Sequence, residues 1–101
     1  MLNTAIHYLY RDASNYKVHT EVVLKGEITA EQIKEVCDCL HDGCYFVPSA
    51  VGLPENRFED WTEDDGPFFE LYDSDFSLTE RPATESMTIS QMVEQFKIGK
   101  N

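Results

Sequence analysis

The stretch CDCLHDGC, residues 37–44, holds the side chains best suited to metal or thiol chemistry. Its three cysteines and His41 are ligand types that zinc prefers. Zinc knuckles, however, place two cysteines two to four residues apart on a turn and usually supply a second pair elsewhere. Helical periodicity sets Cys37, His41 and Cys44 on roughly one side and turns Cys39 away from them. The spacing therefore favours structural cysteines over a metal site.

A nucleophilic cysteine would need a histidine base and positive surroundings, because the thiolate is the reactive form. Asp38 and Asp42 flank His41, and negative charge raises the pKa of a nearby thiol. Cys37 also falls on the apolar stripe of a predicted helix, where a free cysteine behaves as a small hydrophobic residue. We predict no catalytic residue here. A small metal- or thiol-dependent protein built on residues 37–44 remains an alternative.

Other catalytic and ligand-binding motifs do not fit the chain. An EF-hand loop with Gly66 at its sixth position would start at Trp61, and one with Gly43 there would place Leu40 at its third. The five glycines lie far apart, so they form no phosphate-binding loop. Nineteen acidic residues give no basis for selecting a catalytic pair. We therefore expect a protein that is not an enzyme and has no cofactor, with a calcium site of another kind left open.

Negative charge is concentrated in one quarter of the chain. The formal net charge is -11 over 101 residues, and ten of the 19 acidic residues fall in residues 55–80. Arg57 is the only base in that segment. Such a chain repels nucleic acid and membrane surfaces and attracts basic ones. We expect a basic nucleic-acid-binding protein or nuclease complex as partner, with no direct nucleic-acid or membrane contact.

The segment RFEDWTEDDGPFFELYDSDF, residues 57–76, combines eight carboxylates with six aromatic rings. One interpretation is a solvated face that its rings anchor to the core. The other is a rigid acidic surface for a basic partner. On the second interpretation, the predicted partner-contacting residues are Glu59, Asp60, Trp61, Glu63, Asp64, Asp65, Glu70, Asp73 and Asp75.

A protein that imitates DNA must space its carboxylates about as closely as DNA spaces its phosphates. Neighbours on one face of a strand lie about 6.6 Å apart, whereas one DNA strand carries a phosphate every ~3.4 Å. A single acidic strand is thus about half as dense in charge as one DNA strand. The acids of residues 59–65 would have to lie beside Glu70, Asp73 and Asp75 to supply a second row.

Hydrophobic periodicity and capping signals predict an α+β fold. Alternation predicts strands over residues 3–12 and 16–25, joined by a turn at 12–15 into an antiparallel hairpin. Thr29 with Gln32 and Thr88 with Gln91 are capping boxes that start two helices. The first helix is predicted over about residues 30–42, with Gly43 as its stop, and Gly99 ends the second.

The remaining strands are shorter. One is expected at residues 44–47, and residues 68–72 and 76–79 form either one bent strand or a tight hairpin at Asp73-Ser74-Asp75. The order β-β-α-β-β-α predicts a single domain over residues 1–101, with an antiparallel sheet of about four strands and two helices packed on it. The odd cysteine number and the absence of a secretory pattern or long apolar run predict a cytoplasmic protein.

In size, acidity and lack of a catalytic motif, the chain resembles small phage- and plasmid-encoded inhibitors that mimic DNA, among them anti-restriction and anti-CRISPR proteins. The resemblance is one of class, so no functional residue carries over. It implies a non-enzymatic inhibitor that blocks DNA binding by a CRISPR effector or other nuclease. An immunity protein or antitoxin that neutralises a basic toxin is the alternative that uses the same physics.

Overall fold

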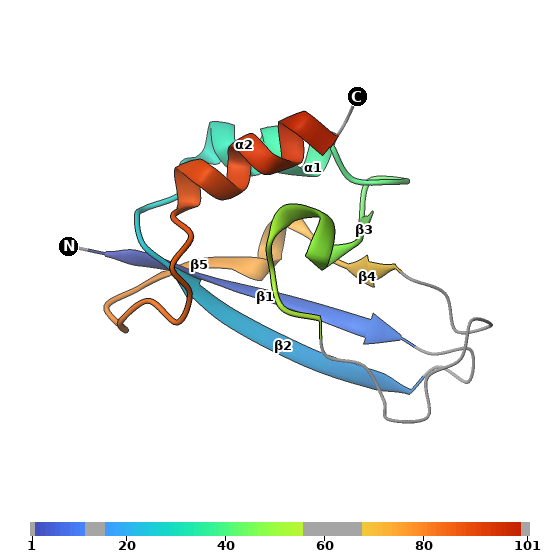
Figure 1. Cartoon of the computed structure of the whole chain (residues 1–101), viewed down its shortest axis with the longest axis horizontal. Coiled ribbons are helices and arrows are strands. Elements are labelled where there is room, and N and C mark those ends of the chain that lie inside the picture. The colour runs from blue at the N-terminus through green and yellow to red at the C-terminus, as the bar shows by residue number, and fades with distance from the viewer. Residues whose placement is uncertain (1, 12–15, 56–67, 100–101) are drawn as a thin grey trace.

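An antiparallel sheet with two helices over one face forms the framework (Figure 1). The computed structural model describes residues 2–11, 16–55 and 68–99. Within these ranges the elements are, in chain order, β1 (Asn3–Arg11), β2 (Lys17–Leu24), α1 (Ala30–Asp38), β3 (Tyr45–Phe46), β4 (Phe69–Glu70), β5 (Phe76–Thr79) and α2 (Ile89–Gly99). This arrangement confirms the predicted α+β class.

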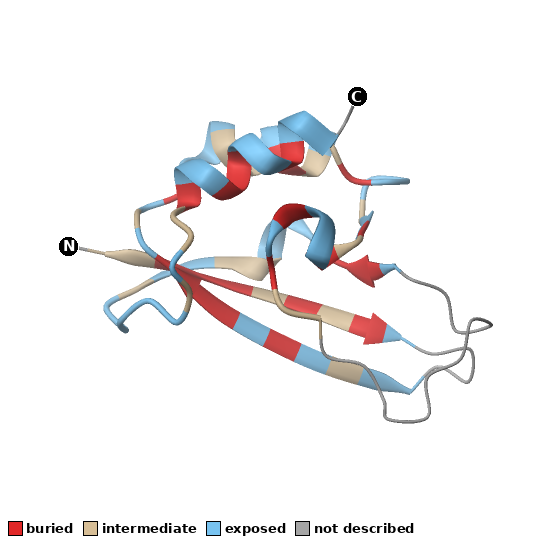
Figure 2. Cartoon of the chain, viewed as in Figure 1, coloured by how far each residue is buried: buried red, intermediate tan, exposed pale blue. Residues whose placement is uncertain are grey.

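Strand β1 is the centre of the sheet. It pairs with the whole length of β2, from Thr4 opposite Leu24 to Arg11 opposite Lys17, which confirms the predicted antiparallel pairing. Burial alternates along part of each strand, but residues 4–6 of β1 and residues 22–24 of β2 are buried in succession (Figure 2). Ile6, Tyr8 and Tyr10 point toward the helices and are fully buried. The predicted turn at residues 12–15 lies outside the described residues.

Strands β4 and β5 are two parts of one interrupted strand along the other edge of β1. Leu9 pairs with Glu70, and Ile6 pairs with Phe76, both antiparallel. An advance of three residues along β1 therefore corresponds to six residues along the interrupted strand. A 3-10 turn at Asp73–Asp75 takes up the extra residues. The bent strand is thus correct and the hairpin is not. Counting its two parts separately gives a five-stranded sheet, in agreement with the predicted sheet of about four strands.

Helix α1 ends at Asp38 rather than near residue 42. His41 and Tyr45 exchange backbone hydrogen bonds of 2.8 and 2.9 Å. Asp42 and Gly43 between them both have positive φ, 52° and 78°. Asp-Gly with two positive φ angles is a typical tight hairpin turn. Gly43 therefore turns the chain toward β3, and the prediction that it stops the helix is wrong.

The capping predictions are confirmed at both helices. The Thr29 hydroxyl accepts from the Gln32 N–H, and the Gln32 side chain accepts from the Thr29 N–H. Thr88 and Gln91 make the same reciprocal pair at the start of α2. These bonds satisfy backbone groups that a helix leaves unpaired at its first turn.

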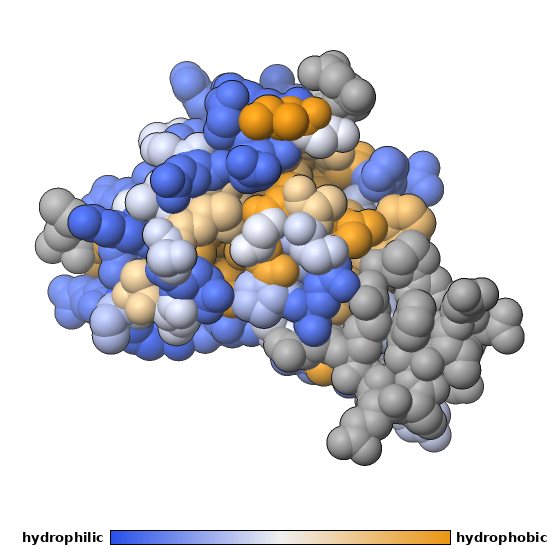
Figure 3. All heavy atoms as spheres, in the orientation of Figure 1, coloured by the Kyte–Doolittle hydropathy of each residue, from blue (hydrophilic) through white to orange (hydrophobic). Residues whose placement is uncertain are grey.

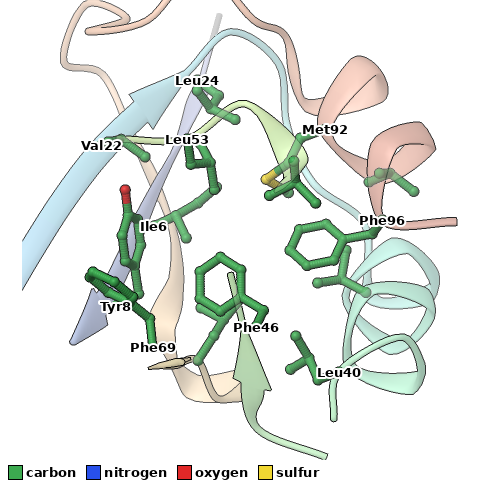
Figure 4. Close-up of a cluster of buried hydrophobic side chains, with 14 of the residues drawn as sticks. Ile6, Tyr8, Val22, Leu24, Leu40, Phe46, Leu53, Phe69, Met92 and Phe96 are labelled. Carbon is green, nitrogen blue, oxygen red and sulfur yellow. The ribbon is translucent and has the colours of Figure 1, made fainter. Parts of the chain in front are cut away.

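The core lies between the helices and the sheet. Phe46 is in edge contact with Tyr8, with centroids 5.4 Å apart, and its ring lies 5.7 Å from that of Phe96 on α2 (Figure 4). Met92 and Val93 of α2 are buried with Phe96. Val36 on α1 and Leu40 just beyond its end are buried, and Ile33 and Cys37 on α1 are half-buried. Figure 3 shows mainly hydrophilic residues over the outer side of the helix layer.

The opposite face of the sheet is covered at one end by the connection between β5 and α2. The Asn3 amide donates to the Arg81 carbonyl at 2.9 Å, and Arg81 pairs with Glu21 at 2.7 Å. Thr84 exchanges backbone and side-chain hydrogen bonds with Val23 on β2. This connection explains why Ala5 and Val23 are 2% exposed although they lie outside the main core cluster.

Candidate partner-binding surface

The interrupted strand positions three of the predicted partner-contacting residues, and it gives them three different environments. Glu70 ends β4, and Asp73 and Asp75 bound the 3-10 turn. The other six, Glu59, Asp60, Trp61, Glu63, Asp64 and Asp65, lie outside the described residues. The predicted second row of carboxylates therefore stays a prediction.

Glu70 does not belong to an exposed acidic surface. It is only 6% exposed. Its carboxylate accepts from Arg11, at 2.8 Å from Nε and 3.3 Å from Nη2, and from the Tyr72 hydroxyl at 2.6 Å. A buried carboxylate needs such partners because losing water is costly. The hydrogen bond to Glu70 is the main reason that the pKa of Tyr72 rises to about 12. Glu70 therefore has a structural role, and its assignment as a partner-contacting residue is corrected.

Asp75 is committed to the local fold on both carboxylate oxygens. Oδ2 accepts from the Tyr72 N–H at 2.9 Å, which closes the 3-10 turn. Oδ1 lies 3.2 Å from Nδ1 of His7 on β1, and the side chain is 18% exposed. Asp75 thus ties the turn to the sheet and leaves little of its charge for a partner.

Asp73 fits the predicted surface better. It is exposed and borders a shallow depression with Ala30, Ile33, Lys34 and Cys37 of α1. Burial raises the pKa of the Cys37 thiol, and the charges of Asp73 and Asp38 raise it further. Both carboxylates therefore lie near Cys37, and the neutral thiol is the opposite of what a nucleophile needs.

Helix α1 contributes acids that the sequence interpretation left out. Glu31, Glu35 and Asp38 are spaced four and three residues apart, so they share one side of the helix, and all three are exposed. Lys97 of α2 pairs with Glu35 at 3.2 Å. We use the name α1 acidic surface for Glu31, Asp38 and Asp73. A helical projection of residues 30–38 was the signal that could have identified the first two.

Ion pairing inside the fold leaves a large excess of negative charge. The described residues contain thirteen carboxylates and six lysines or arginines. Three of those bases are used in pairs with Glu70, Glu21 and Glu35. The remaining acids have too few bases for internal compensation. The described part of the chain therefore carries an outward negative field independent of residues 59–65.

Cys37, Cys39 and His41, which are close together in the sequence, border two separate depressions. Cys39 and His41 border a depression beside Phe46 and Phe96, whereas Cys37 borders the one with Asp73. In residues 2–11, 16–55 and 68–99, no three His, Cys, Asp or Glu side chains converge as a metal-binding group. The same ranges contain no helix with the length and apolar character needed to cross a membrane.

Comparisons with protein-family models, with curated proteins and with solved structures gave no significant match, so a functional proposal has to rest on this chain's own residues.

Proposed function

We propose that the protein is a non-enzymatic acidic inhibitor that acts in the cytoplasm. It would bind the positively charged nucleic-acid-binding surface of a CRISPR effector or other nuclease and exclude DNA from it. The observation that carries the proposal is the uncompensated charge on rigid elements, above all Asp38 on α1 and Asp73 beside it. Five further acids between residues 59 and 65 add to the same sign of field.

The expected mechanism is electrostatic competition. A concentrated negative field speeds encounter with a basic groove and orients the two proteins, and salt weakens this effect strongly. Carboxylates on a helix and a tight turn lose little conformational freedom on binding, so more of the attraction appears as affinity. DNA and the inhibitor would then compete for one surface.

The first experiment is affinity capture from a nuclease-treated bacterial lysate, with elution by a salt gradient and identification by mass spectrometry. The proposal expects one nucleic-acid-processing complex, released by salt and displaced by added duplex DNA. Retention of nothing specific at low salt would refute it. Recovery of a single basic toxin that DNA does not displace would instead identify an immunity protein or antitoxin.

Charge reversal then locates the binding surface on the captured partner. Replacing Glu63, Asp64 and Asp65 together by lysine should abolish inhibition and leave the fold intact. The pair Asp38→Lys and Asp73→Lys should slow association about tenfold or more at low salt. A matched control, Glu80→Lys with Glu94→Lys, changes the net charge equally at two exposed sites outside the α1 acidic surface. Equal effects of the two double variants would show that only total charge matters.

A further inference from the structure

Two histidines on the sheet face opposite the helices meet through their ring nitrogens. His7 on β1 and His19 on β2 lie on neighbouring strands, and Nε2 of His7 is 2.8 Å from Nδ1 of His19. The ring centroids are 5.0 Å apart and the ring planes differ by 25°. With facing nitrogens so close and centroids so far apart, the rings meet edge to edge rather than face to face.

Asp75 sets the orientation of this pair. Its carboxylate lies 3.2 Å from Nδ1 of His7, so that nitrogen carries a proton and donates it. Nε2 of neutral His7 then presents its lone pair toward His19. Asp75 is itself held by the Tyr72 N–H. A carboxylate that binds the remote nitrogen of a histidine is the usual support for histidine ligands of metals, because it fixes the tautomer and strengthens the donor.

We propose that His7 and His19 bind a divalent transition-metal ion of the zinc and copper class. The ion would take the place of the proton between Nε2 of His7 and Nδ1 of His19, and Asp75 would act as the positioning residue. Two nitrogens bound to one tetrahedral zinc ion lie about 3.3 Å apart. The rings therefore need to separate by about 0.5 Å. A small rotation of the side chains is enough, because the His7 side chain is 35% exposed and His19 is exposed.

Water completes the coordination sphere of the ion in this arrangement. Glu21 lies opposite His7 on the same face, but its carboxylate is paired with Arg81 at 2.7 Å. Two imidazole ligands select ions that prefer nitrogen, which places copper and zinc above magnesium, calcium and manganese. The bound ion would join β1 to β2 and so stabilise the folded chain, since ligands that bind only the folded state raise its stability.

The test is titration of the whole chain with zinc chloride, followed by calorimetry and by NMR of the histidine ring nitrogens. We expect one ion per chain, with the largest shifts at Nε2 of His7 and Nδ1 of His19. His7→Gln and His19→Gln should each weaken binding at least tenfold. Asp75→Asn should weaken it about tenfold, as is typical for loss of a supporting carboxylate.

His41→Gln is the matched control, because His41 and Cys39 border the competing thiol-lined depression. It should retain affinity within about twofold and keep the zinc-dependent rise in thermal unfolding temperature, which His19→Gln should lose. Binding that survives both His7→Gln and His19→Gln, or disappears in His41→Gln, would overturn the proposal. Failure of millimolar zinc to shift these two nitrogens would also overturn it and leave the pair as a hydrogen bond only.

Discussion

The hydrogen bond from the Tyr72 hydroxyl to buried Glu70 tests how much this carboxylate depends on its partners for stability. In Tyr72→Phe the carboxylate loses a 2.6 Å bond from the tyrosine hydroxyl and keeps only Arg11 among the partners described for it. Hydrogen bonds to charged groups contribute about 1.5–3 kcal/mol. The Tyr72 side chain is 42% exposed, so water screens part of the effect. We expect a loss of about 1.5 kcal/mol in the free energy of unfolding at pH 7.

The pH dependence of this loss has a defined sign. The pKa of Tyr72 is raised in the folded chain from 10.0 to about 12. A group with a raised folded pKa contributes its full stabilisation below the unfolded pKa and loses it as pH rises through the folded value. The difference between the parent and Tyr72→Phe should therefore be constant below pH 9 and shrink between pH 10 and 12. Burial also raises the pKa of Tyr8, but Tyr8 is present in both proteins and cancels in the comparison.

Urea unfolding at several pH values, followed by circular dichroism, measures both effects. The matched background is Glu70→Gln, which keeps the shape and removes the charge. In that background Tyr72→Phe should cost at least about 0.5 kcal/mol less, because the bond is then neutral. A cost below about 0.5 kcal/mol in the parent, or an identical cost in both backgrounds, would refute the role assigned to the hydroxyl.

Two further substitutions test the fold. Gly43→Ala should lower the free energy of unfolding by about 1 kcal/mol through backbone strain, because the φ of Gly43 is 78° and, beyond its two chain neighbours, no atom of the described residues lies within 4 Å of the added carbon. An unchanged urea midpoint would contradict the turn at Asp42-Gly43. Phe96→Ala should cost about 3–5 kcal/mol, because the ring is 4% exposed and packs on Phe46; a loss under about 1 kcal/mol would show that α2 does not close the core.

Local signals in the sequence were sufficient for most of the framework. Capping boxes start both helices, and alternation in β1 and β2 identifies their buried faces. These features depend on residues close together in the chain, so spacing alone reveals them. The end of α1 was missed for a related reason. Gly43 fits a helix stop as well as a hairpin turn, and only the pairing of His41 with Tyr45 distinguishes the two.

The candidate site was less accessible to sequence reasoning because it depends on register across strands. Glu70 is buried because β4 pairs with β1 and lies next to Arg11, 59 residues earlier in the chain. No composition count distinguishes it from Asp73, three residues later, which is exposed. His7 and His19 likewise meet through the pairing of β1 with β2. Their separation in sequence, twelve residues, carries no recognised ligand spacing.

The 3-10 turn between β4 and β5 also separates two roles that the sequence assigned to one surface. Asp73 points toward α1 and adds to the α1 acidic surface, whereas Asp75 is bound to His7 and to the turn. A partner that reads negative charge should therefore respond to Asp73→Lys and be nearly indifferent to Asp75→Asn. Zinc binding at the histidine pair should show the reverse. Asp73 and Asp75 are only two positions apart in the chain. Opposite effects of their substitutions on partner binding and zinc binding would show that the 3-10 turn, and not the local density of acids, determines what each carboxylate does.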